Sequence, residues 1–420
     1  MDRGKSPPLK HSFPKTNIEM DSEEIVEWCD EYLPELYNPG YFDDENTTLT
    51  IRQEVVQLAH STVLEFIEDE DERDIMLEEI QDASEDWFRT HRDAEIDALQ
   101  PLSEDDITAI LSRPQTTQHS GDWYAQRSNR LTASEFSKIL DGRRGRLLRE
   151  KIANAAGEWS QSNMGIATED GKMNACIWGH RFEPIVRDIY ELESAGVGAV
   201  SDTVGRFTHA TIPWLSASPD GLVIRGPIAG RLVEIKAPYS RDPDESEFIY
   251  KDYYPQMQIQ MEVCDLEAVD FTEAVFEQCH TSIMDEHTDE IAAARWKGYI
   301  RVIGKRDEPS TWKYQYTAPV EDLEDAILPP MDTSSNTDVS ILETSVWWLK
   351  NWYPRTVMRN RTWWETIAKP AAELFWTQVI SGREAAAESA VQMEEPTQKL
   401  EPEPSPSLSP SLSSGWKGSS

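Results

Sequence analysis

Two carboxylates and a lysine near the middle of the chain have the types and the order to bind a divalent cation beside a phosphate. Asp220 lies in a turn-rich run, and Glu234 and Lys236 follow on a segment whose alternation from Arg231 to Pro238 is typical of a strand. Side chains two apart on a strand share a face. We therefore expect Glu234 and Lys236 to point the same way, close to Asp220.

These residue types suit metal-dependent hydrolysis of a phosphodiester. Mg²⁺ prefers oxygen ligands and keeps several waters, so Asp220, Glu234 and the backbone carbonyl of Ile235 would leave room for water and a phosphate oxygen. Such an ion lowers the pKa of bound water, and a second ion about 4 Å away can serve the leaving oxygen. Lys236 would orient or help deprotonate the water and neutralise charge. We expect one or two ions, Mg²⁺ or alternatively Mn²⁺; the competing interpretation is an ordinary surface strand.

Three further blocks flank these motifs in a fixed order, residues 123–135 and 178–191 upstream and residues 253–262 downstream. Together with Ser218-Pro219-Asp220-Gly221 and Glu234-Ile235-Lys236, they resemble the phage-lambda-type exonuclease family. This family is also called the YqaJ-type viral recombinase nucleases and lies within the PD-(D/E)XK superfamily. The resemblance covers roughly residues 119–320, and five blocks in order are far more specific than any one of them.

The resemblance implies a catalytic set, which is Asp220, Glu234, Lys236, Glu183 and Gln258. Glu183, in a helix that precedes the sheet, would be an additional metal ligand beside Asp220, Glu234 and the Ile235 carbonyl. From the residues alone, the favoured interpretation of Glu183 is a first-turn helix acid that suits the helix dipole. Gln258 is taken from a run in which Gln256 and Gln260 offer other registers.

Contacts to a DNA end are implied for a second set, Arg127, Arg130, Thr132 and Ser134. Arg127 matches the arginine that grips the 5′-phosphate, and Ser134 matches a phosphate contact. Thr132 or Ser134 also reads as the cap of a helix whose free backbone N–H groups could hold a phosphate. The competing interpretations are simple capping and, for Arg127 and Arg130, a solvated helix face.

The function implied is a 5′-to-3′ exonuclease that acts on double-stranded DNA ends and leaves 3′ overhangs for recombination or replication. A single-strand annealing or replication protein is the implied partner, and a homo-oligomer is implied by the ring-forming phage members. Two alternatives stay open. One is a structure-specific endonuclease of the same superfamily, and the other is a non-catalytic DNA-end-binding scaffold.

The predicted fold class is α/β and restriction-endonuclease-like. A central mixed sheet, with Asp220 and the Glu234/Lys236 strand at one edge, would be flanked by the Glu183 helix and the Gln258 helix. The predicted units are a disordered N-terminus (1–20), an acidic helical extension (21–118), a nuclease domain (119–320), a Trp-rich helical segment (321–385) and a disordered tail (386–420). We favour packing over single-strand base stacking for the tryptophans.

Charge is the observation that fits a DNA enzyme least. The 420 residues carry 40 Lys and Arg against 77 Asp and Glu, whereas DNA binding favours a basic surface. Residues 1–120 hold 9 basic and 31 acidic residues, and residues 121–151 hold 8 basic and 4 acidic ones. The positive charge is therefore local to the expected DNA-end contacts. We expect the acidic extension to be detached and to dock a partner; a solubilising appendage and a DNA-mimicking lid are the alternatives.

Neither an apolar run of membrane-spanning length nor a secretory leader is recognisable. We therefore expect a soluble intracellular protein with no membrane contact, in the host cytoplasm or nucleus if the source is viral. The four cysteines are Cys29, Cys176, Cys264 and Cys279. Their scattered spacing suits a reducing compartment and gives no indication of structural zinc.

Overall fold

The computed structural model describes residues 20–118, 120–153, 173–193, 199–243, 248–330 and 339–394. Most of the predicted disordered N-terminus and tail lies outside these residues. The tail prediction needs one correction, because helix α12 (Lys369–Glu394) continues past the expected boundary at residue 386.

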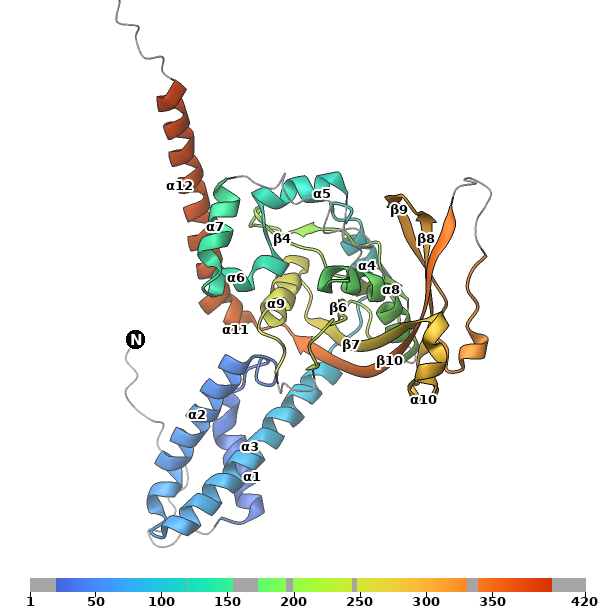
Figure 1. The fold of residues 1–420 in the computed structure, drawn as a ribbon. Helices are drawn as coiled ribbons and strands as arrows, with labels where there is room; N and C mark the ends of the chain where they lie inside the picture. Colours follow the sequence, from blue (N-terminus) through green and yellow to red (C-terminus); the bar gives the residue numbers. More distant parts are fainter. Residues whose placement is uncertain are drawn as a thin grey trace, which may run out of the picture.

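The acidic extension folds as a helical unit that projects from the body of the molecule (Figure 1). Its helices are α1 (Ser22–Tyr32), α2 (Glu45–Thr62) and α3 (Glu70–Ala98). Asp21, Asp44 and Asp69 cap them by accepting hydrogen bonds from first-turn N–H groups. The helices enclose a core of their own that includes Trp28 and Phe88. The predicted acidic helices are thereby confirmed.

The expectation that this unit is detached is wrong. Arg92 donates to the carboxylate of the fully buried Asp43 at 2.9 Å and to the backbone oxygen of Thr356 at 2.8 Å. Asn360, itself buried, donates to the side-chain oxygen of Asn38 at 2.7 Å. Hydrogen bonds between buried polar groups fix geometry, because breaking them leaves unpaired groups. The helical unit is therefore anchored to the body.

The last helix of the predicted extension packs with the body. Helix α4 (Glu104–Leu111) begins at a capping box formed by Ser103, and its Ile107 belongs to the largest apolar core. The backbone N–H of Leu102 donates to the oxygen of Ala229 at 2.9 Å. Structurally, the projecting unit ends near residue 99.

A large mixed sheet forms the centre of the body (Figure 1). Its strand order is β2 (Val200–Ser201), β5 (Gly221–Val223), β6 (Leu232–Lys236), β7 (Ala268–His280), β10 (Ser340–Met358), β8 (Lys297–Lys305) and β9 (Glu308–Tyr316). Strands β6 and β7 are parallel, and the other described pairs of this sheet are antiparallel. The predicted mixed sheet is confirmed, but β6 lies between β5 and β7 instead of at an edge.

A smaller sheet and eight further helices surround this one. The small sheet has the order β1 (Leu131–Thr132), β4 (Leu215–Ala217) and β3 (Phe207–Thr208). The remaining described α-helices are α5 (Gly121–Gln126), α6 (Ser137–Leu140), α7 (Arg144–Ile152), α8 (Ala175–Glu193), α9 (Tyr253–Cys264), α10 (Thr288–Ala293), α11 (Arg361–Trp363) and α12. Among the described helices, none is long and apolar enough to cross a bilayer.

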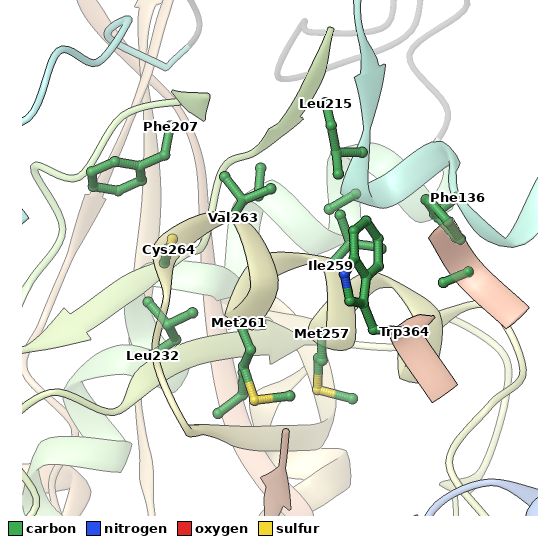
Figure 2. Packing of buried hydrophobic residues seen from close by; sticks show 14 of the residues in the cluster. Phe136, Phe207, Leu215, Leu232, Met257, Ile259, Met261, Val263, Cys264 and Trp364 are labelled. Atoms are coloured by element: carbon green, nitrogen blue, oxygen red, sulfur yellow. The ribbon is translucent and has the colours of Figure 1, made fainter. Parts of the chain in front are cut away.

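Helices α8 and α9 cover opposite faces of the sheet, as the alternation of β6 requires. Leu232 packs into the cluster around α9, whereas Val233 and Ile235 pack into the cluster around α8. Figure 2 shows Met257 and Ile259 of α9 among the packed residues. A helix that is apolar on most sides is a buried helix. The α/β class with flanking helices is thereby confirmed.

The Trp-rich segment is only partly helical, which corrects the prediction for residues 321–385. Residues Ser340–Met358 form strand β10, inserted between β7 and β8, and Trp347 on it is fully buried. The aromatic and β-branched side chains of this stretch favour a strand once two neighbours can pair with it. Farther along, Trp363, Trp364 and Trp376 lie in the core around α9. These tryptophans therefore belong to the packed core, which is the interpretation we favoured from the sequence.

Candidate active site

Asp220 is fastened to strand β6 through the backbone. Its N–H donates to the oxygen of Val233 at 3.1 Å, and its Oδ2 accepts from the N–H of Ile235 at 2.8 Å. The turn before β5 thus holds the Asp220 carboxylate beside the strand that carries Glu234. The two motifs predicted to act together are brought together.

Glu234 lies at the centre of a hydrogen-bonded group. The side chain is fully buried, and Lys236 on the same face of β6 donates to its Oε1. Gln256 donates to Oε1 at 2.5 Å, and Gln260 donates to Oε2 at 2.6 Å. The predicted common face of Glu234 and Lys236 is confirmed. Helix α9 supplies the amides that fix the carboxylate.

Burial and close charges shift the titration of this group. Burial, and next the negative charge of Asp220, raise the pKa of Glu234 to about 7. Burial acts to lower the pKa of Lys236, but Glu234 and Asp220 outweigh it and raise that pKa above its ordinary value. Lys236 is therefore an ammonium ion at neutral pH, and it compensates part of the negative charge.

Glu183, on helix α8, lies within electrostatic reach of the same group. Burial and then the charge of Asp220 raise its pKa to about 7, and Arg187 one turn later lies 3.2 Å from its Oε1. His180 precedes it on the helix, where burial lowers the pKa of the imidazole against the opposing effect of Asp220. Three acids from different elements therefore share one electrostatic environment.

The donor chemistry of the acids fits a hard divalent cation. The available ligands are oxygens only, the set that Mg²⁺ and Mn²⁺ prefer. The raised pKa values of Glu183 and Glu234 reflect burial and the charge of Asp220, and a bound cation would offset both effects. In the arrangement observed, no three His, Cys, Asp or Glu residues of the described chain are gathered as a ready-made metal cluster.

Gln258 is not part of this group, which corrects its assignment. Its amide donates to the backbone oxygen of Met358 at 2.8 Å and accepts from the N–H of Asn360 at 2.7 Å. Positions 256 and 260 are four apart and share a helix face, whereas position 258 is turned to another side. Gln256 and Gln260 occupy the place that was predicted for Gln258.

The predicted DNA contacts lie around a buried capping box. Thr132 donates through Oγ1 to Glu135 at 2.8 Å, and its N–H donates to the same carboxylate at 3.2 Å. Ser134 is exposed, and Arg127 lies with its Nε 3.3 Å from Glu135. Capping is thus the observed role of Thr132, one of the two interpretations made from the residues. The Oγ of Ser134 lies 3.4 Å from Oγ1 of Thr132.

Arg130 joins strand β3 to the loop between β3 and β4. Its Nη1 donates to Oγ1 of Thr208 at 2.9 Å and to the oxygen of Pro213 at 2.7 Å. The guanidinium of Arg127, in contrast, lies 5.6 Å from the centre of the Trp123 ring. The two arginines therefore border the same region in different ways, and Arg127 is the one next to the α5 aromatic.

Direct hydrogen bonds join this region to the acids. Trp123 of α5 donates from its indole N–H to Oγ of Ser218 at 3.1 Å, two residues before Asp220. Gln118 donates to the oxygen of Pro219 at 2.9 Å, in the same loop. The segment that carries Arg127 and the loop that carries Asp220 are thus joined by hydrogen bonds. The two predicted site groups form one continuous region.

Several of these contacts could not be read from the motifs. The i, i+4 spacing of Gln256 and Gln260 was visible, and helix geometry alone would have grouped them. The positions of Trp123 and Arg206 depend on tertiary contacts, because Arg206 pairs with Thr116 in a β-bridge before α5 and donates to the backbone oxygen of Trp123 at 2.6 Å. No local pattern announces such a bridge.

The fold and the site define an α/β protein in which Asp220, in the turn before β5, meets Glu234 and Lys236 of the adjoining strand β6, in the order of the PD-(D/E)XK motif. Residues 122–267 match the family model for the YqaJ-like viral recombinase domain. This match supports the family resemblance carried by the sequence blocks. The matched segment contains every residue predicted for the catalytic set and for the DNA contacts.

Relatives were found in sequence and in structure. An uncharacterized protein of Acanthamoeba polyphaga mimivirus is 25% identical over 185 residues, which cover 41% of this chain and 32% of the relative. The match thus spans about a third of that relative's length. The alkaline exonuclease LHK-Exo from Laribacter hongkongensis is 18% identical with a TM-score of 0.38, over 65% of this chain and 100% of that one. The structure of its complex with dAMP is 17% identical in sequence with a TM-score of 0.37, and the coverage of both chains is the same.

Proposed function

We propose that the chain is a metal-dependent DNA nuclease that hydrolyses phosphodiester bonds. The observation that carries this proposal is the fastening of Asp220 to the strand that holds Glu234 and Lys236. The match of residues 122–267 to the YqaJ-like viral recombinase domain supports it. A scaffold that only binds DNA ends would not need a fully buried acid, a second acid and a lysine in one group.

In this proposal Asp220, Glu234, Glu183 and the carbonyl of Ile235 hold Mg²⁺ or Mn²⁺. The bound cation would supply a water of lowered pKa and would stabilise negative charge on the phosphate. Gln256 and Gln260 orient Glu234 through its two oxygens. As an ammonium ion, Lys236 neutralises charge that builds up on the phosphate oxygens in the transition state.

The finer proposal is a 5′-to-3′ exonuclease on double-stranded ends that leaves 3′ overhangs. It is supported by the hydrogen bond from Trp123 to Ser218, which joins the helix just before Arg127 to the loop just before Asp220. An arginine held there could bind the terminal phosphate while the acids act on the next bond. A single-strand annealing or replication protein would use the overhang, and assembly into a homo-oligomer would keep the enzyme on its strand.

Digestion of end-labelled linear duplex beside covalently closed circles tests this function. We expect Mg²⁺-dependent loss of the linear DNA and intact circles, with label released first from the 5′ end. Cleavage of circles would instead identify a structure-specific endonuclease. Binding of ends without cleavage in Mg²⁺ or Mn²⁺ would favour the scaffold.

A further inference from the structure

Arg206 is a buried cation whose hydrogen bonds are incomplete. The residue is 2% exposed, yet its Nε and Nη2 have no hydrogen-bond partner among the residues that the structure describes. Its Nη1 donates to the backbone oxygen of Trp123 at 2.6 Å, and its guanidinium lies 4.4 Å from the centre of that indole ring. A charged group buried with free donors is costly, so its retention calls for an explanation.

The surroundings add positive charge instead of compensating for it. Burial, and next the charges of Arg127 and Arg130, lower the pKa of Arg206 to about 10. Glu135 acts in the opposite direction, but its carboxylate already accepts from Lys151 at 2.9 Å and pairs with Arg127. Arg206 thus lies beside two other arginines, and the carboxylate that acts on it is already engaged by Lys151 and Arg127. An anion bound from solution would add negative charge next to these guanidinium groups.

The backbone fixes Arg206 in this position. The N–H of Arg206 donates to the oxygen of Thr116 at 2.8 Å, and the N–H of Thr116 donates back at 3.2 Å. Trp123, with Arg206 and Arg127 both over its ring system, is tied by its indole N–H to Ser218. The cation is therefore placed at a set distance from the loop of Asp220.

We infer that Arg206 is a specificity-determining residue for a terminal phosphate monoester, acting from beneath Trp123 to strengthen the site at Arg127. The side chain of Arg127 is 12% exposed and would meet the phosphate first. Arg206 supplies additional charge and holds the indole on which Arg127 rests, so it is a positioning residue. A phosphate monoester carries more negative charge than a phosphodiester and would gain most from clustered guanidinium groups. The inference rests on the proposed function, which provides DNA ends as the ligand.

Binding without metal tests the inference independently of cleavage. Fluorescence anisotropy in EDTA would compare 5′-phosphorylated with 5′-hydroxyl duplexes. We expect the full-length protein to prefer the phosphate by about 10-fold or more, as charge-assisted hydrogen bonds allow. Arg206→Gln keeps a donor for the Trp123 carbonyl but loses the charge, and should reduce the preference to about 3-fold or less. Arg206→Lys keeps the charge and should retain more of the preference.

Arg181 offers a matched control, because it is also 2% exposed but pairs with Glu343 on the far strands. Arg181→Met should lower stability and leave the preference unchanged. An unchanged preference in folded Arg206→Gln would overturn the inference even if the protein is a nuclease. Conversely, a preference lost only in Arg206→Gln would support it even if no cleavage were seen. If Arg206→Gln does not fold, the full-length protein is unfolded thermally in inorganic phosphate and in chloride at equal ionic strength. The absence of stabilisation by phosphate would then overturn the inference.

Discussion

At the scale of single residues, Glu234 shows how a buried carboxylate can be kept available. Its two oxygens accept hydrogen bonds from Gln256, Gln260 and Lys236, so its orientation does not depend on a bound ion. The burial that raises its pKa also removes competing water. The side chain is thus pre-oriented, which is the condition under which charged groups contribute most to catalysis.

The first prediction concerns the acids and the lysine. Asp220→Asn, Glu234→Gln and Lys236→Ala should each lower the rate of DNA cleavage by at least about 10²-fold, because each removes a ligand or a compensating charge. The measurement is the cleavage rate of purified variants whose circular dichroism matches that of the unchanged protein. Near-unchanged rates in any two of them would refute the site.

The second prediction separates two neighbouring glutamines of α9. Gln260→Leu removes a donor to Glu234 and should reduce cleavage about 10-fold or more. Gln258→Leu leaves the oxygen of Met358 and the N–H of Asn360 buried and unpaired. It should lower the free energy of unfolding by about 1–3 kcal/mol and change the rate less. Urea unfolding measures the stability of both variants, and single-turnover kinetics measures their cleavage rates. A larger loss of rate in Gln258→Leu than in Gln260→Leu would restore Gln258 to the catalytic set.

At the scale of elements, what the sequence predicted well was local. The β6 strand and the α8 helix follow from short-range alternation and spacing, and both are present. Strand β10 was missed because it inserts between β7 and β8, with β7 starting more than seventy residues upstream. A run such as Trp347-Trp348 is apolar enough for a helix or a strand, and only the available partners decide. The contact of the acidic unit with the body through Asn38 could not be predicted either, because it joins residues far apart in the chain.

The third prediction concerns the capping box at Glu135. Burial acts to raise the pKa of Glu135, but Arg127 and Lys151, with hydrogen bonds from Lys151 and Thr132, lower it to about 2. A lowered folded-state pKa contributes stability above the unfolded value of about 4.5, and this contribution is lost as pH falls toward 2. The shift corresponds to about 3 kcal/mol.

Glu135→Gln should therefore lower the free energy of unfolding by about 3–5 kcal/mol at pH 7, since it leaves buried cations unpaired. In urea unfolding at each pH, the difference in unfolding free energy from the unchanged protein should narrow as pH falls from about 5 toward 2. Glu150→Gln is the control. It removes the exposed partner of Arg146, a kind of pair that contributes only about 0–1 kcal/mol. A difference that stays constant with pH would show that Glu135 is not the titrating group.

At the scale of the whole molecule, the acidic charge is separated from the expected DNA surface. Residues 1–99 hold 28 acidic and 8 basic residues. The arginines of residues 143–146 are engaged elsewhere, Arg143 with Asp252, Arg144 with Gln378 and Arg146 with Glu150. Repulsion between exposed charges falls off over roughly 8 Å at physiological salt. The acidic unit is therefore anchored to the body without contacting this basic stretch, which argues against a lid.

The last prediction uses the structural boundary near residue 99. Deleting residues 1–99 removes the projecting helices but keeps α4 and Gln118, so the nuclease body should still fold and cleave, with DNA affinity and its salt dependence changed by less than about 3-fold. Deleting residues 1–118 also removes Ile107 from the core and Gln118 from the loop before Asp220. Losing one buried residue of this size costs about 2–5 kcal/mol. The longer deletion should unfold at markedly lower temperature and lose activity. Thermal unfolding compares the stability of the two deletion variants with that of the full chain, and a salt series on one duplex compares their DNA affinities. A large gain in affinity on removing residues 1–99 would show that the acidic unit covers the DNA surface.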